Sequence, residues 1–102
     1  DPYINVFFDA ILSLKTRKEC EQFFDDICTI AEIKSLVQRM QVAVLLNDGK
    51  TYSEITSDVN VSTATISRVN RCLEYGADGY KTVLSRISTN VNDENKDNEV
   101  KK

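Results

Sequence analysis

Small hydroxyl side chains and two arginines recur between residues 62 and 71 with a helical spacing. If Ile66, Val69 and Leu73 face the interior, a rotation of about 100° per residue turns the opposite face to solvent. That face carries Thr63, Ala64, Ser67, Arg68 and Arg71. Hydroxyls can bond several base edges, an alanine methyl can contact thymine, and arginine reaches guanine or phosphate. The spacing therefore favours contact with double-stranded DNA.

The smallest of these side chains come first along the helix. A recognition helix enters the major groove with its N-terminal residues at the base edges, where bulk would hold the backbone away. Ser62 can cap this helix by accepting from the N–H of Ala64 or Thr65, and the positive helix end favours a nearby phosphate. The alternative is an ordinary solvated helix face, which is the better interpretation of any one of these residues alone.

Another short helix, residues 52–59, comes before this helix in the sequence, and a tight turn separates the two. Asn60 is expected to adopt the left-handed conformation in that turn. Five apolar residues lie where a helix-turn-helix must lock its helices together: Ile55, Val59, Val61, Ile66 and Val69. Glu54 is expected to fold back onto the helix cap and Asp58 to point away from phosphate.

These considerations define a candidate helix-turn-helix at residues 52–73. Three residues of its first helix are expected near the DNA backbone, and seven residues of its second helix and cap are expected at or near the bases. The complete set is Tyr52, Ser53, Thr56, Ser62, Thr63, Ala64, Thr65, Ser67, Arg68 and Arg71.

Four more amphipathic stretches surround this motif. Apolar residues recur with helical spacing over 4–12, 20–28, 33–44 and 80–87. Asp1 and Pro2 suit the start of the first stretch. The third is expected to end at 47–49 and to bury Ile33, Leu36, Val37, Met40 and Val44.

Helix starts are marked by three capping-box patterns, each a threonine followed three residues later by glutamate. They are Thr16 with Glu19, Thr29 with Glu32, and Thr51 with Glu54. Together with a helix end at Gly76 and the absence of strand alternation, they predict an all-α domain of about six helices over residues 1–88. Residues 89–102 are rich in Asn and charge and are expected to form a polar tail.

Composition narrows the function. The 102 residues carry 16 acidic and 13 basic side chains, so a DNA contact must depend on a few well-placed cations. The chain has no histidine, the residue that general-base sites use most, and no Gly-rich phosphate loop, so an enzyme is not expected. Three cysteines cannot complete a four-ligand zinc site, and reduced, packed thiols are expected instead. With no membrane-spanning or signal segment, the cytosol is the expected compartment.

The run YSEITSDVNVSTATISRVNRCL, residues 52–73, resembles the helix-turn-helix of the Trp repressor superfamily. STATISRVNRCLEYGADGY, residues 62–80, is similar to the YerC/YecD-type branch of Trp repressor-related bacterial proteins. Extended upstream through LVQRMQVAVLLNDGKTYSEI, the resemblance covers residues from about 16 to 84. It implies an intertwined homodimer, with Thr63, Ala64 and Ser67 at base edges. It also implies that Tyr52, Ser53 and Thr56 lie near the DNA backbone.

The resemblance also implies a small-molecule effector site, from which this chain departs. In the family, an arginine at the place of Arg68 stacks on a bound indole and a glycine follows it, whereas Val69 follows here. Cys72 replaces a serine that helps hold the ligand's amino group, and the second pocket arginine aligns with Gln38 or Arg39. Tryptophan is therefore not the expected ligand. Arg39, Arg68 and Cys72 form a candidate effector site; the alternative is that Arg68 binds phosphate and Cys72 is packed.

The sequence thus predicts a dimeric, sequence-specific DNA-binding transcriptional regulator, acting as a repressor and needing no obligatory cofactor. A first helix rich in Phe and Ile favours association with a second copy, against the alternative that all apolar stripes close within one monomer. The second functional hypothesis is a helical protein-interaction adapter that keeps the fold without reading DNA, which the acidic balance favours. A third and weaker one is an enzyme subunit.

Overall fold

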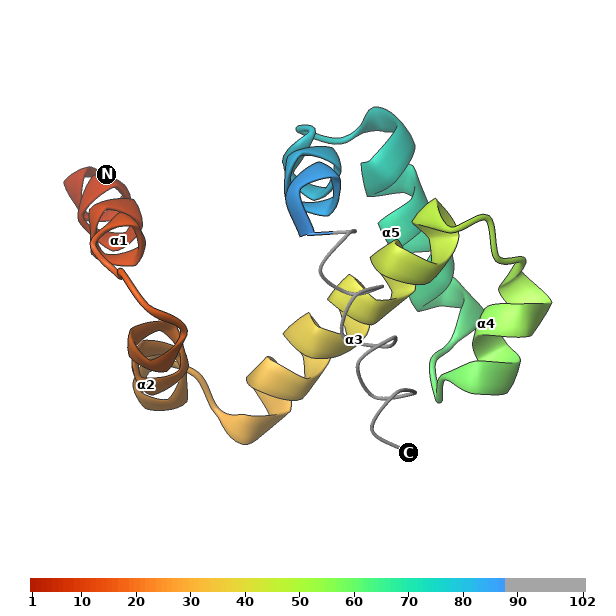
Figure 1. The fold of residues 1–102 in the computed structure, drawn as a ribbon, viewed down its shortest axis with the longest axis horizontal. Helices are drawn as coiled ribbons and strands as arrows, with labels where there is room; N and C mark the ends of the chain where they lie inside the picture. The colour runs from red at the N-terminus through yellow and green to blue at the C-terminus, as the bar shows by residue number, and fades with distance from the viewer. Residues whose placement is uncertain (88–102) are drawn as a thin grey trace, which may run out of the picture. The chain divides into compact units, whose positions relative to one another are not determined.

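The computed structural model describes residues 1–87, which contain only helices and their connections (Figure 1). The elements are α1 (Pro2–Leu12), α2 (Arg17–Ile27), α3 (Ile30–Asn47), α4 (Tyr52–Asp58), α5 (Thr63–Tyr75) and a helical stretch over residues 79–87. The predicted all-α fold is confirmed. The polar tail predicted for residues 89–102 lies outside the described residues.

Two of the three predicted capping boxes form in full. The backbone N–H of Thr29 donates to the Glu32 carboxylate at 2.8 Å, and that of Glu32 donates to Thr29 Oγ1 at 3.1 Å. Thr51 and Glu54 exchange the same pair at 3.0 and 3.2 Å. Each glutamate carboxylate is stabilised mainly by the hydrogen bond from the threonine backbone N–H and to a smaller extent by the threonine hydroxyl. These contacts hold the pKa of both glutamates below the ordinary value.

The start of α2 differs slightly from the expected box. Thr16 accepts from the backbone N–H of Glu19 at 3.1 Å, as predicted. The Glu19 carboxylate, however, accepts from the backbone N–H of Lys15 at 2.9 Å, one residue before the cap. The box is incomplete because the chain enters this helix with the Lys15 N–H, rather than that of Thr16, within reach of the glutamate.

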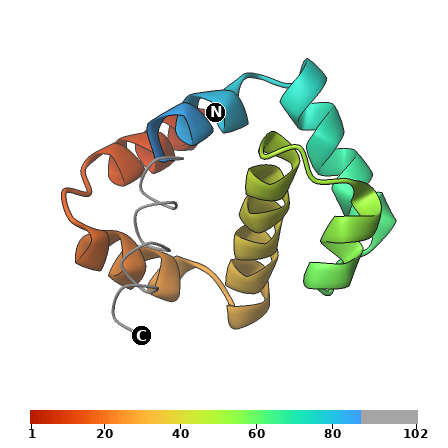
Figure 2. The same cartoon turned by 45° about the vertical axis from the view of Figure 1, so that its right-hand side comes forward.

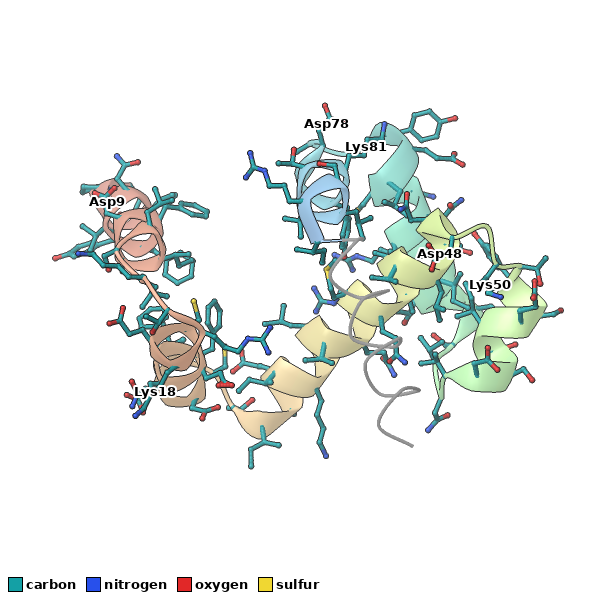
Figure 3. The ribbon with its side chains drawn as sticks, viewed as in Figure 1. Asp9, Lys18, Asp48, Lys50, Asp78 and Lys81 are labelled. Carbon is teal, nitrogen blue, oxygen red and sulfur yellow. The ribbon has the colours of Figure 1, made fainter. Side chains whose placement is uncertain are left out.

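A Schellman motif ends α3. The N–H of Gly49 donates to the Leu46 carbonyl at 3.0 Å, and the N–H of Lys50 donates to the Leu45 carbonyl at 3.1 Å. Gly49 has a φ of +85°, which a residue with a Cβ adopts at a cost. Asp48 and Lys50, labelled in Figure 3, flank this glycine. The predicted helix end at 47–49 is confirmed.

The hydrophobic core joins the C-terminal half of α3 to α4, α5 and the stretch 79–87 (Figures 1 and 2). Its most deeply buried side chains are Val42, Ala43, Ile55, Ile66, Val69 and Leu84. All belong to a compact unit of the chain that begins at Val37. This core holds the two helices of the candidate DNA-binding motif.

The buried face of α3 differs from the predicted one. Val42 and Ala43 are fully buried, whereas Leu36 is 44% and Val37 60% exposed. Met40 and Val44, both predicted to be buried, are half-buried and pack against the core, so the prediction is confirmed in part. Residues 42–46 are apolar without interruption, so helical spacing could not tell which of them face the core.

Residues 1–36 form the other compact unit, and it has no buried core of its own. No residue of α1 or α2 is buried in the described chain, although both helices are amphipathic. The exposed large apolar residues of this unit are Tyr3, Ile4, Val6, Phe7, Phe8, Leu12, Ile27, Ile30 and Leu36. The predicted apolar stripe of α1 is therefore present and open to solvent within one chain.

Helix α5 ends at Gly76, as predicted, and the close approach of the Cys72 carbonyl requires a glycine at this position. The N–H of Gly76 donates to the Cys72 carbonyl at 2.9 Å, and a Cβ at this position would overlap that carbonyl oxygen. The backbone of Gly76 is not left-handed, with a φ of −83°. Asp78, which pairs with Lys81 at 3.9 Å (Figure 3), takes the left-handed conformation instead, with a φ of 67°.

Replacing Gly76 tests this close approach. We expect Gly76→Ala to lower the free energy of unfolding by about 1–3 kcal/mol, because the new methyl group forces the end of α5 to shift. Gly79→Ala is the matched control, since nothing lies within 4 Å of a Cβ at that position. Urea unfolding followed by circular dichroism measures both, and equal stability of the two variants would contradict the steric explanation.

Candidate nucleic-acid interface

The turn between α4 and α5 is short and internally hydrogen-bonded. The N–H of Val59 donates to the Ile55 carbonyl at 2.8 Å and closes α4. The N–H of Val61 then donates to the Val59 carbonyl at 2.8 Å, which makes Asn60 the centre of a three-residue turn. The prediction of a left-handed Asn60 is wrong: among residues 1–87, Asp78 is the non-glycine residue with a positive φ. A three-residue turn of this kind reverses the chain without that conformation.

A side chain from α3 holds this turn. Gln38 Nε2 donates to the Asn60 carbonyl oxygen at 2.7 Å, across 22 positions of the sequence. Gln38 precedes the buried Val42 by four residues, so both lie on the same side of α3. No sequence pattern predicted this contact of Gln38, whose only expected role was as a match to the family's second pocket arginine. Its place on the face of α3 that meets the core was the signal available, but that face was predicted only in part, because Leu36 and Val37 are exposed.

Two of the predicted contact residues form the start of α5. Ser62 Oγ accepts from the backbone N–H of Thr65 at 3.2 Å and lies 3.1 Å from the Thr65 hydroxyl oxygen. The predicted Ser62 cap is confirmed, with Thr65 as its donor. Because the two hydroxyls bond each other and Thr65 is partly buried, this pair is already engaged in shaping the helix start.

The other predicted residues of α5 share its exposed face. Ile66 is fully buried and Val69 is 2% exposed, so this side of the helix faces the core, as predicted. The residues exposed on α5 and predicted to meet DNA are Thr63, Ala64, Ser67, Arg68 and Arg71. The structure thus presents small and hydroxyl side chains in the first two turns and both arginines further along.

Helix α4 presents the three residues predicted near the DNA backbone. Tyr52 is 37% exposed, and Ser53 and Thr56 are exposed. The Thr56 hydroxyl donates to the Ser53 carbonyl at 3.1 Å, so it needs a different rotamer to donate to a phosphate. Glu54 is bonded to the Thr51 cap as expected, whereas the predicted direction of the exposed Asp58 stays a prediction.

The charges of residues 52–75 are closely balanced. Glu54, Asp58 and Glu74 oppose Arg68 and Arg71. Glu74 accepts a long hydrogen bond from the Asn70 amide at 3.5 Å, within the same helix. Attraction to phosphate must therefore come locally from two exposed arginines, the positive end of α5 and neutral hydroxyls, because the motif has no excess of positive charge.

One of the three candidate effector residues, Cys72, lines an apolar pocket beside the end of α5. Arg39, Arg68 and Cys72 are all exposed. An open, mainly apolar pocket of about 460 Å³ contains Cys72 but neither arginine, and its lining is Met40, Cys72, Gly76, Ala77, Gly79, Tyr80 and Val83. Val69 belongs to the core and does not line this pocket.

The cysteines differ in part from expectation. All three are free thiols, but Cys20 and Cys72 are exposed and only Cys28 is partly buried, so the prediction of packed thiols is wrong for two of them. Cys20 belongs to the apolar stripe predicted over residues 20–28, and no residue of α2 is buried in the described chain. Within residues 1–87, no cluster of three side chains suited to a metal ion occurs, and no helix has the length and hydropathy needed to cross a bilayer.

The geometry of α4, the three-residue turn and α5 defines a helix-turn-helix: two short helices packed through a shared core, the second capped and exposing a face of small polar side chains. Residues 3–88 match the Trp repressor protein family, and the chain belongs to that family. The predicted resemblance is thereby confirmed.

Relatives and solved structures agree with this assignment. The chain is 54% identical over 84 residues to the uncharacterised protein YerC of Bacillus subtilis (strain 168), covering 82% of this chain and 81% of that one. A TrpR-like protein from Eubacterium eligens superposes with a TM-score of 0.81 at 50% identity, over 86% of this chain and 91% of its own. A protein provisionally described as a Trp repressor, from Staphylococcus aureus, gives the same score and identity over 86% and 88%.

Serine substitutions separate the capping hydroxyl from the exposed one. We expect Ser62→Ala to lower the free energy of unfolding by about 1 kcal/mol, because the N–H of Thr65 loses its acceptor. Ser67→Ala, on the exposed face of the same helix, should change it by less than about 0.5 kcal/mol. Thermal unfolding of both variants measures the difference. A Ser67→Ala variant as unstable as Ser62→Ala would show that Ser67 has a structural role.

Proposed function

We propose that this protein is a sequence-specific DNA-binding transcriptional regulator that acts as a repressor. The observation that carries the proposal is the exposed face of α5, where Thr63, Ala64 and Ser67 precede Arg68 and Arg71 on a helix anchored by Ile66 and Val69. Membership of the Trp repressor family supports it. So does the relation to the Staphylococcus aureus protein provisionally described as a Trp repressor.

The residue types suggest how the contacts divide. Small side chains at the start of α5 let the backbone approach the floor of the major groove, and their hydroxyls can bond base edges directly or through water. Arg68 and Arg71 are long enough to reach guanine or phosphate. Tyr52, Ser53 and Thr56 on α4 would position the motif on the DNA backbone. Because hydroxyls make few base-specific bonds, part of the specificity should arise from DNA shape.

The proposal includes a homodimer. The unit formed by residues 1–36 exposes apolar side chains on both of its complete helices, including Phe8 at 56% and Leu12 at 81%. Contiguous exposed apolar surface marks an interaction site in a soluble protein, and a second copy supplies the same surface. Two copies would present two α5 helices to successive major grooves about 34 Å apart, on an operator with inverted half-sites. Repression would follow from occlusion of the promoter.

The proposal includes no tryptophan effector. The pocket beside Cys72 is mainly apolar and includes neither arginine of the candidate set, which argues against a site for a free amino acid. We therefore propose that tryptophan is not the ligand and that DNA binding does not depend on it.

The second candidate function is a protein-interaction adapter that keeps this fold. The net charge of −3 is the observation that favours it, since DNA-binding surfaces are usually basic. The two functions differ in what the exposed face of α5 does. In an adapter, this face could carry negative charge without affecting any DNA contact.

Charge reversal on α5 distinguishes the two functions. We expect Ser67→Glu combined with Arg71→Glu to weaken binding to a mixed-sequence pool of DNA duplexes by about a hundredfold at low salt, since the new carboxylates repel phosphate. Fluorescence anisotropy measures the affinity, and circular dichroism verifies the fold.

The matched control is Ser85→Glu combined with Arg86→Glu, on the exposed surface of the helical stretch 79–87 and outside the unit proposed to form the dimer. This pair also replaces one serine and one basic residue by glutamate, so the net charge changes equally. The proposal requires the control to bind at least ten times more tightly than the α5 variant. Equal affinities of the two variants would mean that α5 does not meet DNA.

A further inference from the structure

Two kinds of contact connect α3 to the helix-turn-helix, and they differ in what they can fix. The core contacts of Val42 and Ala43 with Ile55, Ile66 and Val69 are aliphatic. Such contacts are non-directional and depend on the area removed from water. They bring the helices together, but they leave the turn between α4 and α5 without a directional contact to α3.

The hydrogen bond from Gln38 to Asn60 supplies that direction. Its N···O distance of 2.7 Å is at the short end of the range for amide donors. Among the hydrogen bonds within residues 1–87, this one alone joins residues more than five positions apart. The others lie within helices, caps and turns. The Gln38–Asn60 hydrogen bond is therefore the one directional contact between α3 and the turn within the described residues.

The acceptor, the Asn60 carbonyl, lies close to the start of α5, so the hydrogen bond from Gln38 can fix the position of that helix end. Asn60 is the centre of the three-residue turn, and Ser62, the N-cap of α5, follows two residues later. A displacement of the Asn60 carbonyl must move Val61 and the cap, because Val61 is bonded back to Val59. The first residues of α5, Thr63 and Ala64, come directly after the cap and are the ones proposed to reach the bases.

We propose that Gln38 is a positioning residue for DNA recognition: its amide fixes the α4–α5 turn on α3 and so sets how the first turn of α5 meets the major groove. This inference rests on the proposed function for its DNA consequence, although the link itself is independent of DNA. Gln38 touches no base. It acts through Asn60, and small misplacements of a binding element cost affinity out of proportion to the bond that is lost.

Four substitutions on α3 test the proposal. Gln38→Met keeps the length of the side chain but removes the donor, and Gln38→Glu also places a carboxylate against the Asn60 carbonyl. Gln41 is exposed on the same helix and no hydrogen bond of its side chain occurs in the described structure, so Gln41→Met and Gln41→Glu are the matched controls. Thermal unfolding of every variant establishes that binding is measured on folded protein.

The binding experiment uses a duplex enriched from a random pool by the unchanged protein. We expect Gln38→Met to bind it about tenfold more weakly, and Gln38→Glu more weakly still, while both Gln41 variants stay within about twofold of the unchanged protein. Loss of discrimination between this duplex and unrelated DNA should accompany the loss of affinity. If Gln38→Met binds as tightly and as selectively as Gln41→Met, the proposal is wrong.

Amide hydrogen exchange without DNA separates this inference from the proposed function. Removing the link should speed exchange at Val61 and Ile66 by about tenfold in Gln38→Met, with no change in Gln41→Met. Unchanged exchange would overturn the positioning role whether or not the protein binds DNA. Faster exchange, together with no DNA binding by the unchanged protein, would support the link and contradict the proposed regulator.

Discussion

The burial of a few aliphatic side chains between α3 and the α4–α5 pair is the constraint on which the candidate interface depends. Ile55, Ile66 and Val42 are fully buried. Burying one such side chain is worth about 1.5–3 kcal/mol, which is large beside the stability of a small domain. Because α4 has only seven residues and is too short to be stable alone, its place is decided by this core. The exposed face of α5 is then what remains on the side opposite the core.

Much of this arrangement could be predicted because local signals and packing agree. The threonine–glutamate pairs mark helix starts, and the full boxes at Thr29 and Thr51 form as the pattern indicates. The alternation of buried Ile66 and Val69 with exposed Ser67 and Arg68 follows from helical periodicity. For the same reason, the exposed candidate residues of α5 were identified correctly as a face, although their contact with DNA stays a prediction.

The features that could not be predicted depend on contacts distant in sequence or on fine geometry. The partner of Gln38 lies 22 positions away and is a backbone carbonyl, which no side-chain pattern reveals. The shape of the turn at Asn60 depends on a Val61–Val59 hydrogen bond, which asparagine's preference for the left-handed region does not anticipate. On α3, an uninterrupted apolar run concealed which residues, Val42 and Ala43, face the core.

The central claim, that a dimer of this acidic chain reads DNA through α5, is tested most directly by selecting bound duplexes from a random pool at near-physiological salt. A salt titration on the most enriched sequence completes the measurement. The account predicts an inverted repeat whose half-sites are centred about one helical turn apart, with affinity that falls steeply as salt increases. A pool that shows no enrichment, from protein verified as folded, would contradict it and favour the adapter.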